Sequence, residues 1–307
     1  MDWNSSDIRG LVVAALAEDV GTGDITVAAT IREEARAQAR IVANQHMICA
    51  GLPLAEKVFQ GLDPQMSIEL CAADGQEVRN GKDILHLRGA VSAILTGERT
   101  ALNFLGHLSG IATQTRLFVE QIAGTQTKIR ATRHTTPGLR LLEQYAVEMG
   151  GGKQSHVGLF DAILLTTNHI ALTGGVKAAL DQAHTYASSQ MTPRSMTAYE
   201  AVGTSPFEVD GTSLSIQIEV RNEAELREAL SAGAESLLLV NTPPDHARHL
   251  IQIVRRASPD CIIEISSDIT LANVRAYAQS GADYLSSCAL TLSAPKATLS
   301  LLVDNPQ

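Results

Sequence analysis

The stretch Gly97-Glu-Arg-Thr-Ala-Leu-Asn-Phe-Leu105, continued by Ser109-Gly-Ile-Ala-Thr113, lies between two parts of the chain whose sequence patterns differ. It belongs to a Leu- and Ala-rich region, residues 92 to 123, which predicts one or two long helices. Before it, between residues 36 and 95, short alternating runs are separated by Gly, Pro and Asp, and these predict antiparallel strands. After about residue 128, apolar runs alternate with helical stretches, which indicates a parallel sheet built from βα units.

The second part of the chain contains six short apolar runs of strand length. They are rich in β-branched residues, and a helix-like segment follows each one, which is typical of buried parallel strands. Six such units within about 160 residues suit a small or incomplete barrel, and a doubly wound open sheet is the alternative that the residues leave open. The six predicted strands are Lys128–Arg133, Asp161–Thr166, Ser215–Val220, Ser236–Asn241, Cys261–Ser266 and Asp283–Ala289.

The first part of the chain begins with a predicted helix. Residues 7 to 17 place apolar side chains at helical spacing behind Asp7, so we expect an amphipathic helix capped by Asp7. The turn-rich segment Gly21-Thr-Gly-Asp24 ends this helix. Antiparallel strands are expected at Ala39–Ala43, Ser67–Leu70 and Asp83–Leu87.

The composition is that of a globular protein with a large core, because 45% of its 307 residues are hydrophobic. A net charge of −9 and a pI near 5.5 argue against a nucleic-acid or anionic-membrane partner, since both require a basic surface. An anionic ligand therefore needs a local cluster of cations. The sequence shows no signal peptide and no apolar run of about 18 residues. Its four cysteines form no metal-binding spacing, so we expect free thiols and a cytoplasmic protein.

A series of motifs begins at Gly97 and continues in order almost to the C-terminus. With this series, the chain resembles the quinolinate phosphoribosyltransferase family, the carboxylating nicotinate-nucleotide diphosphorylases of NAD biosynthesis, over roughly residues 8 to 303. The motifs that carry the resemblance are Glu18-Asp-Val-Gly-Thr-Gly-Asp-Ile-Thr26, Ala50-Gly-Leu-Pro53, Thr132-Arg-His-Thr-Thr-Pro-Gly-Leu-Arg140, Tyr145-Ala-Val147, Gly150-Gly-Gly152, Gly158-Leu-Phe-Asp161, Asn168-His-Ile170, Ile218-Glu-Val220, Glu264 and Ala289-Leu-Thr291.

The resemblance implies an α/β fold with two domains. An N-terminal α/β sandwich over residues 1–112, against which residues 286–307 pack back, would be joined to an open-sided β/α barrel of the type II phosphoribosyltransferase kind over residues 113–285. It also implies a homodimer in which the neighbouring subunit donates Arg99 to a shared site. The reaction would convert quinolinate and phosphoribosyl pyrophosphate into nicotinate mononucleotide, carbon dioxide and pyrophosphate.

Residues that bind the pyridine dicarboxylate follow from the resemblance. Arg99 and Arg133 match two arginines that grip carboxylates, a task for which a bidentate guanidinium is well suited. His134, His156 and Thr166 stand where the family pattern has permanent cations. With an ordinary histidine pKa of about 6.5, such a pocket would be less positive at neutral pH and would bind a dianion more weakly.

The resemblance also implies a metal and phosphate half of the site. Glu219 matches an acidic residue that helps to hold Mg²⁺, whereas Gln217 and Val240 replace other carboxylates. The 5′-phosphate would lie between two turns, one carrying Ser266, Ser267 and Asp268 and the other carrying Cys288 and Ala289. Asp268 would repel a phosphate in this position. His134, His156, His169 and Glu219 as ligands of a transition metal form a less favoured alternative.

Three functions are consistent with these replacements. The chain is a phosphoribosyltransferase that acts on quinolinate, a paralogue that acts on a less anionic pyridine-like or nucleotide-like substrate, or a non-catalytic binding or regulatory relative. Residues 186 to 214 are polar, are punctuated by Pro and Gly, and exceed the usual loop length of about 2–6 residues. They indicate an insertion that forms a surface loop, or else a lid or partner contact.

Overall fold

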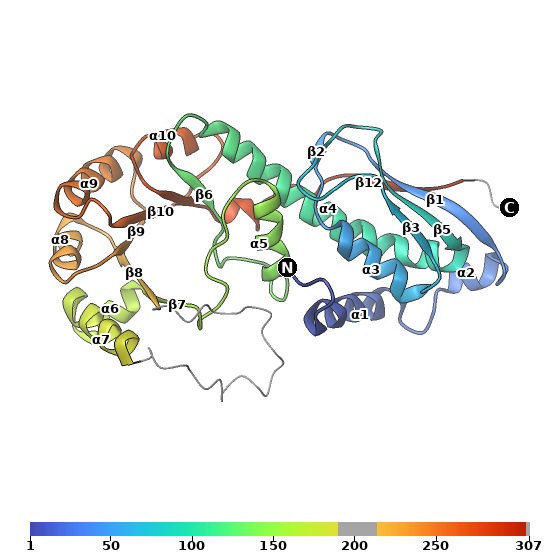
Figure 1. The fold of residues 1–307 in the computed structure, drawn as a ribbon, viewed down its shortest axis with the longest axis horizontal. Coiled ribbons are helices and arrows are strands. Elements are labelled where there is room, and N and C mark those ends of the chain that lie inside the picture. Colours follow the sequence, from blue (N-terminus) through green and yellow to red (C-terminus); the bar gives the residue numbers. More distant parts are fainter. Residues whose placement is uncertain (190–213, 305–307) are drawn as a thin grey trace.

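The computed structural model describes residues 1–189 and 214–304 of the 307-residue chain. The two larger β-sheets lie at opposite ends of an elongated molecule, and the long helix α4 (Val91–Gln121) runs between them (Figure 1). Among the described residues, no helix combines the length and the apolar character needed to span a membrane.

The first sheet is antiparallel and has four strands in the order β12-β1-β5-β3. The predicted antiparallel strands are therefore confirmed, and each of their ends lies within three residues of the expected one. The last strand of the chain, β12, pairs with β1 and so brings the C-terminal segment to the first sheet. The elements of this part are α1 (Ser6–Val20), α2 (Ile25–Thr30), β1 (Arg36–Ala43), β2 (Met47–Ile48), α3 (Leu52–Leu62), β3 (Ser67–Leu70), β4 (Glu77–Val78), β5 (Asp83–Ala90) and β12 (Leu299–Val303).

The predicted N-terminal helix is present, but its cap was assigned to the wrong residue. Helix α1 begins one residue earlier than expected, and the Ser5 hydroxyl accepts the N–H of Ile8 at 3.4 Å. Asp7 lies in the first turn of the helix, where a negative charge is favourable next to the free N–H groups. Serine and aspartate are both good caps, so the local sequence does not distinguish them.

Helix α4 is one continuous helix, where the sequence allowed one or two. Glycines let neighbouring backbone approach closely on both sides. A side chain at Gly110 would collide with the carbonyl oxygen of Pro295, and one at Gly150 would collide with the carbonyl oxygen of Ala112 on α4. Packing therefore accounts for Gly150 of the triple-glycine motif. The expected domain boundary between residues 112 and 113 lies inside this helix.

The second sheet has six parallel strands in the order β6-β11-β10-β9-β8-β7. All six predicted strands exist, although β6 and β11 are shorter than expected. The elements are β6 (Lys128–Arg130), α5 (Arg140–Met149), β7 (Ala162–Leu165), α6 (Thr167–Thr173), α7 (Val176–Ser189), β8 (Ser215–Val220), α8 (Glu223–Ser231), β9 (Ser236–Val240), α9 (Pro244–Ala257), β10 (Ile262–Ser266), α10 (Val274–Ala278), β11 (Tyr284–Ser286) and the 3-10 helix η1 (Cys288–Leu290).

The order of these strands is that of an open-sided barrel. Strands β7 to β11 follow one another in sequence, and the first strand, β6, pairs with the last, β11. A doubly wound sheet would instead reverse direction at an internal switch point. Helices α6 to α10 lie around the outer side of the strands (Figure 1), and the ring stays open between β6 and β7 within the described part of the chain.

Only the two ends of the predicted insertion at residues 186 to 214 lie within the described residues. Residues 186–189 form the last turn of α7, because Tyr186 and Ser189 continue the helical pattern of Val176–Ser189. Residues 190–213 lie outside the described residues, so the surface-loop and lid hypotheses for this segment remain untested.

Candidate functional site

Three segments at the carboxyl ends of the parallel strands are joined to one another by hydrogen bonds. The loop after β6 is tied to the turn after β11, because Thr291 Oγ1 donates to the carbonyl of His134 at 2.7 Å. The turn after β11 is tied to the turn after β10, because Ser287 Oγ donates to the carbonyl of Ile269 at 2.7 Å. The carboxyl ends of barrel strands are where ligands ordinarily bind, so these segments form the candidate site.

Arg133 and His134 lie in the loop after β6. Arg133 is partly buried and its Nη1 donates to the carbonyl of Gly158 at 3.2 Å. The segment around Gly158 is shaped by Asp161, which accepts the N–H groups of Val157 at 2.7 Å and Gly158 at 3.3 Å. The side chain of His134 is exposed and makes no hydrogen bond with any described residue.

Glu143 on α5 holds the same loop from inside the molecule. Its carboxylate is fully buried; one oxygen accepts the backbone N–H of Thr136 at 3.1 Å, and the other lies 2.8 Å from Nε2 of His107 on α4. Burial raises the pKa of Glu143, but the hydrogen bonds from His107 and Thr136 outweigh it and hold the pKa below its ordinary value. An ionised carboxylate therefore links α4, α5 and the loop that carries Arg133.

His156 lies close to several charged groups. Its Nδ1 is 3.8 Å from Oδ2 of Asp161, and its side chain is 22% exposed. Burial, reinforced by the positive charges of Arg130 and Arg133, lowers the pKa of His156, and the carboxylates of Asp161 and Glu264 only partly oppose this. The pKa of His156 therefore lies below the ordinary value that the sequence analysis expected, which favours the neutral ring in the free protein.

A polar network that the sequence analysis did not assign crosses the interior of the parallel sheet. Nη1 of Arg130 at the end of β6 donates to Oε2 of Glu264 on β10 at 2.9 Å, and Nε2 of Gln217 on β8 donates to the same oxygen at 3.2 Å. The Arg130 guanidinium also lies over the ring of Tyr284, 4.6 Å from its centroid. Arg130, Gln217 and Glu264 are polar residues within strands of the parallel sheet, and this sequence signal could have identified the network, because buried parallel strands are normally apolar.

Thr166 and Glu219 lie at the ends of the neighbouring strands β7 and β8. Thr166 caps helix α6, and its hydroxyl is 2.7 Å from Nδ1 of His169, so its side chain is engaged locally. Glu219 Oε2 accepts the N–H of Thr167 at 2.8 Å, and no described residue bonds its other oxygen. Within the described residues, no cluster of three or more His, Cys, Asp or Glu side chains could hold a metal, so the transition-metal alternative has no support there.

The predicted phosphate residues lie in the two joined turns. Ser266 ends β10, Ser267 accepts the hydroxyl of Tyr277 at 3.2 Å, and Asp268 is exposed. Cys288 is an exposed free thiol at the start of η1, and the N–H of Ala289 donates to Ser287 Oγ at 3.1 Å. That amide is therefore already engaged in the absence of a phosphate.

Arg99 is not brought to these residues by any contact within one chain. It is an exposed residue on the part of α4 that packs against the N-terminal helices, where the neighbouring Thr96 and Thr100 hydroxyls bond Asp24 at 3.1 Å and Asp19 at 3.4 Å. No described residue forms a hydrogen bond or ion pair with its guanidinium. Its place in a site remains a prediction that requires a second chain.

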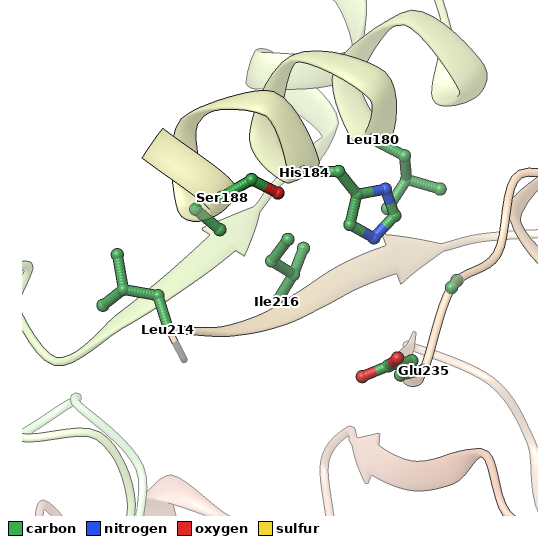
Figure 2. A pocket seen from close by; sticks show the side chains of 8 residues that line it. Leu180, His184, Ser188, Leu214, Ile216 and Glu235 are labelled. Atoms are coloured by element: carbon green, nitrogen blue, oxygen red, sulfur yellow. The ribbon is translucent and has the colours of Figure 1, made fainter. Parts of the chain in front are cut away.

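A hollow of about 140 Å³ lies at the opposite end of the parallel sheet (Figure 2). Ile216 near the start of β8 and Glu235 just before β9 line it, together with Leu180 and His184 of α7. These are the amino ends of the strands, so this hollow is separate from the candidate site.

Comparison with known protein families gives two matches that together cover most of the chain. Residues 24–109 match the family described as "Quinolinate phosphoribosyl transferase, N-terminal domain". Residues 111–200 and 194–302 match "Quinolinate phosphoribosyl transferase, C-terminal domain".

Individual proteins are similar over nearly the whole length. A probable nicotinate-nucleotide pyrophosphorylase (carboxylating) of Synechocystis sp. is 37% identical over 94% of this chain and 90% of its own length. A protein of the same name from Bacillus subtilis is 35% identical over 97% of this chain and 94% of its own. The solved structure of the nicotinate-nucleotide pyrophosphorylase from Francisella tularensis superposes with a TM-score of 0.85 at 33% identity, covering 97% of this chain and 96% of that one.

Proposed function

Because this chain belongs to the quinolinate phosphoribosyltransferase family and is homologous over its full length to nicotinate-nucleotide pyrophosphorylases, we propose that it converts quinolinate and phosphoribosyl pyrophosphate into nicotinate mononucleotide. The pyridine nitrogen forms the new bond to the ribose carbon, and pyrophosphate leaves with the electron pair of the broken bond. The ring then loses one carboxylate as carbon dioxide and takes up a proton at that carbon.

The observation that carries this proposal is the joined set of segments at the carboxyl ends of the strands. Arg133 and His156 lie close enough for their charges to interact, and both flank the segment that Asp161 shapes. Arg133, His134, His156 and Thr166 would face the pyridine dicarboxylate. Ser266, Ser267, Asp268, Cys288 and Ala289 would face the phosphate. Holding two anions in register is the main task in such a transfer, because positioning and charge stabilisation supply most of the rate.

The chain has one carboxylate that suits a magnesium ion shared with the substrate. Mg²⁺ commonly takes one or two protein carboxylates and completes its shell with water and phosphate oxygens, and Glu219 with its unpartnered oxygen fits that arrangement. When bound, the ion would neutralise charge on the departing pyrophosphate. Gln217 has an amide in place of a carboxylate, and this amide donates a hydrogen bond to Glu264, so the position offers the metal no carboxylate ligand.

We include a homodimer in this proposal, with Arg99 of one subunit completing the site of the other. The exposed guanidinium of Arg99 supports this arrangement, because no described residue of its own chain forms a hydrogen bond or ion pair with it. We also place the protein in the cytoplasm, since Cys49, Cys71, Cys261 and Cys288 are all free thiols, as a reducing compartment would keep them.

An assay of quinolinate turnover with phosphoribosyl pyrophosphate and Mg²⁺, in which the formation of nicotinate mononucleotide is measured, tests the proposal directly. We expect measurable turnover that stays below about 1 s⁻¹, because His134, His156 and Thr166 replace permanent cations in the family pattern. The His134→Lys/Thr166→Lys/His156→Arg variant should be faster than any of its single variants, since the three positions act on one ligand.

A second candidate is a paralogue that acts on a less anionic pyridine, and two observations favour it. The lowered pKa of His156 favours the uncharged ring at that position, and Thr166 is engaged in capping α6. Turnover of nicotinate but not of quinolinate in the same assay would select this candidate. Binding of either acid without turnover would instead indicate the non-catalytic relative.

A further inference from the structure

Arg130 is a largely buried cation inside the parallel sheet, at the carboxyl end of β6. Its side chain is 20% exposed, and its ion-pair partner Glu264 is 8% exposed, with 2.9 Å between Nη1 and Oε2. Both side chains are therefore mostly shielded from solvent. A buried ion pair contributes little net stability compared with apolar side chains of similar size, so stability alone does not explain this pair.

The guanidinium of Arg130 is held in place but only partly used. Its Nε donates to the carbonyl of Gln154 at 3.2 Å, its Nη1 donates to Glu264, and one face lies on the ring of Tyr284. An arginine has five N–H donors. These two bonds leave three donors, both hydrogens of Nη2 and one of Nη1, without a partner among the described residues.

Arg130 lies near two of the residues predicted to bind the pyridine acid, Arg133 and His156. Nε of Arg130 donates to the carbonyl of Gln154, two residues before His156, and the charges of Arg130 and Arg133 both contribute to the lowered pKa of His156. Glu264 is the carboxylate that orients Arg130, and Gln217 in turn orients Glu264. Glu264 and Gln217 therefore fix the position of the Arg130 guanidinium, a support that an isolated surface arginine would lack.

We propose that Arg130 is a substrate-binding residue whose free guanidinium edge donates to a carboxylate of the pyridine dicarboxylate, together with Arg133. A planar fork of N–H donors matches a planar carboxylate. Arg130 thereby supplies a permanent positive charge in a pocket where Thr166 has no charge and burial lowers the pKa of His156. This inference rests on the proposed function for the identity of the ligand.

The test is the dissociation constant of quinolinate, measured by calorimetry without turnover, for the wild-type protein and for Arg130→Lys. Lysine keeps the charge and the pairing with Glu264 but loses the fork. We expect quinolinate to bind about tenfold more weakly to Arg130→Lys, and phosphoribosyl pyrophosphate to bind with less than about a twofold change. Unchanged quinolinate affinity, or an equal loss for both ligands, would overturn the inference.

Arg255→Lys is the matched control. Arg255 is also a partly buried arginine in an ion pair, with its Nη2 2.7 Å from Oδ2 of Asp283, and its Nη1 donates to the carbonyl of Cys261. These two partners lie at the amino ends of β11 and β10, which is the end of the sheet opposite the candidate site. This variant should lose a similar amount of thermal stability and bind quinolinate like the wild type. If Arg255→Lys weakened quinolinate binding as much as Arg130→Lys does, the role of Arg130 would be structural.

A second variant covers the possibility that Arg130→Lys disturbs folding. Arg130→Met/Glu264→Met removes both charges together, so no unpaired buried charge remains and the fold should be retained. Its melting temperature reports folding, and its quinolinate affinity should fall at least as far as that of Arg130→Lys. If quinolinate binding depends on Arg130 but the wild-type protein shows no turnover, the proposed function alone is overturned. If the wild-type protein turns quinolinate over and Arg130→Lys binds it with unchanged affinity, this inference alone is overturned.

Discussion

Asp268 stands in the turn after β10, where a phosphate of the substrate is proposed to lie. Its side chain is exposed, and its backbone is not in the left-handed region, because Asn241 is the single non-glycine residue with positive φ among the described residues. We expect Asp268→Gly to bind phosphoribosyl pyrophosphate about fivefold more tightly, since a nearby negative charge costs about 1 kcal/mol in a solvated site. Calorimetry measures this change.

The control for Asp268 is Asp260→Gly, which removes another exposed charge just before β10, at the other end of the strand. It should leave the affinity for phosphoribosyl pyrophosphate unchanged. If Asp268→Gly binds no more tightly than the control, the Asp268 carboxylate points away from the phosphate.

His156 predicts proton uptake on binding of a dianion. Its pKa in the free protein lies below 6.5, and a bound dicarboxylate stabilises the protonated ring and raises that pKa. Quinolinate should therefore bind more tightly as the pH falls from about 8 to about 6, and calorimetry in buffers of different ionisation enthalpy should show protons taken up.

The pH dependence of quinolinate binding should be reduced in His156→Gln. It should persist in His184→Gln, because His184 lines the hollow at the opposite end of the sheet. An identical pH profile in His156→Gln and the wild type would remove His156 from the ligand site.

At the scale of the elements, Glu143 couples α4, α5 and the loop after β6. Its folded-state pKa is lowered, so its contribution to stability is fully present above the unfolded pKa of about 4.5 and is lost as the pH falls through the folded pKa. Glu143→Gln should therefore destabilise the protein by about 2 kcal/mol at pH 7, as expected for a lost hydrogen bond to a charged group. Urea unfolding at pH 7 and at pH 4 should show that the difference from the wild type is smaller at the lower pH.

Glu148→Gln is the control for this substitution. Glu148 lies on the same helix, but it is exposed and bonds only the side chain of Gln154, at 2.8 Å. Its replacement should change the free energy of unfolding by less than about 0.5 kcal/mol at either pH. A pH-independent effect of Glu143→Gln would show that the Glu143 carboxylate is not ionised in the folded protein.

At the scale of the whole molecule, the shared site predicts complementation between two inactive variants. Arg99→Ala and Arg133→Ala should each be inactive as homodimers. After unfolding and refolding as a mixture, about a quarter of wild-type activity should return, because about half of the dimers are mixed and each of these has one intact site. The activity of the mixture measured against each variant alone is the readout, and a mixture that stays inactive would contradict a site shared between subunits.

Much of the architecture was predictable from the sequence, because strand and helix periodicity is a property of neighbouring residues. All six parallel strands were located from apolar runs that alternate with helical stretches, and three of the four strands in the first antiparallel sheet were located from alternating runs separated by Gly, Pro and Asp. The motif order from Gly97 to Thr291 indicated the family to which the chain belongs. The errors at this level are local, such as Ser5 rather than Asp7 as the cap of α1.

The site was less predictable, because its properties depend on groups that are distant in the sequence. Arg130 and Glu264 are 134 positions apart and meet only because β6 pairs with the last strand of the barrel. The pKa of His156 is set by burial and by the charges of residues on other segments. Motifs and periodicity are properties of residues that are close together in the sequence, so the sequence by itself determined them. The contact between Arg130 and Glu264 and the charge state of His156 depend on strand order and register, which exist only in the folded chain.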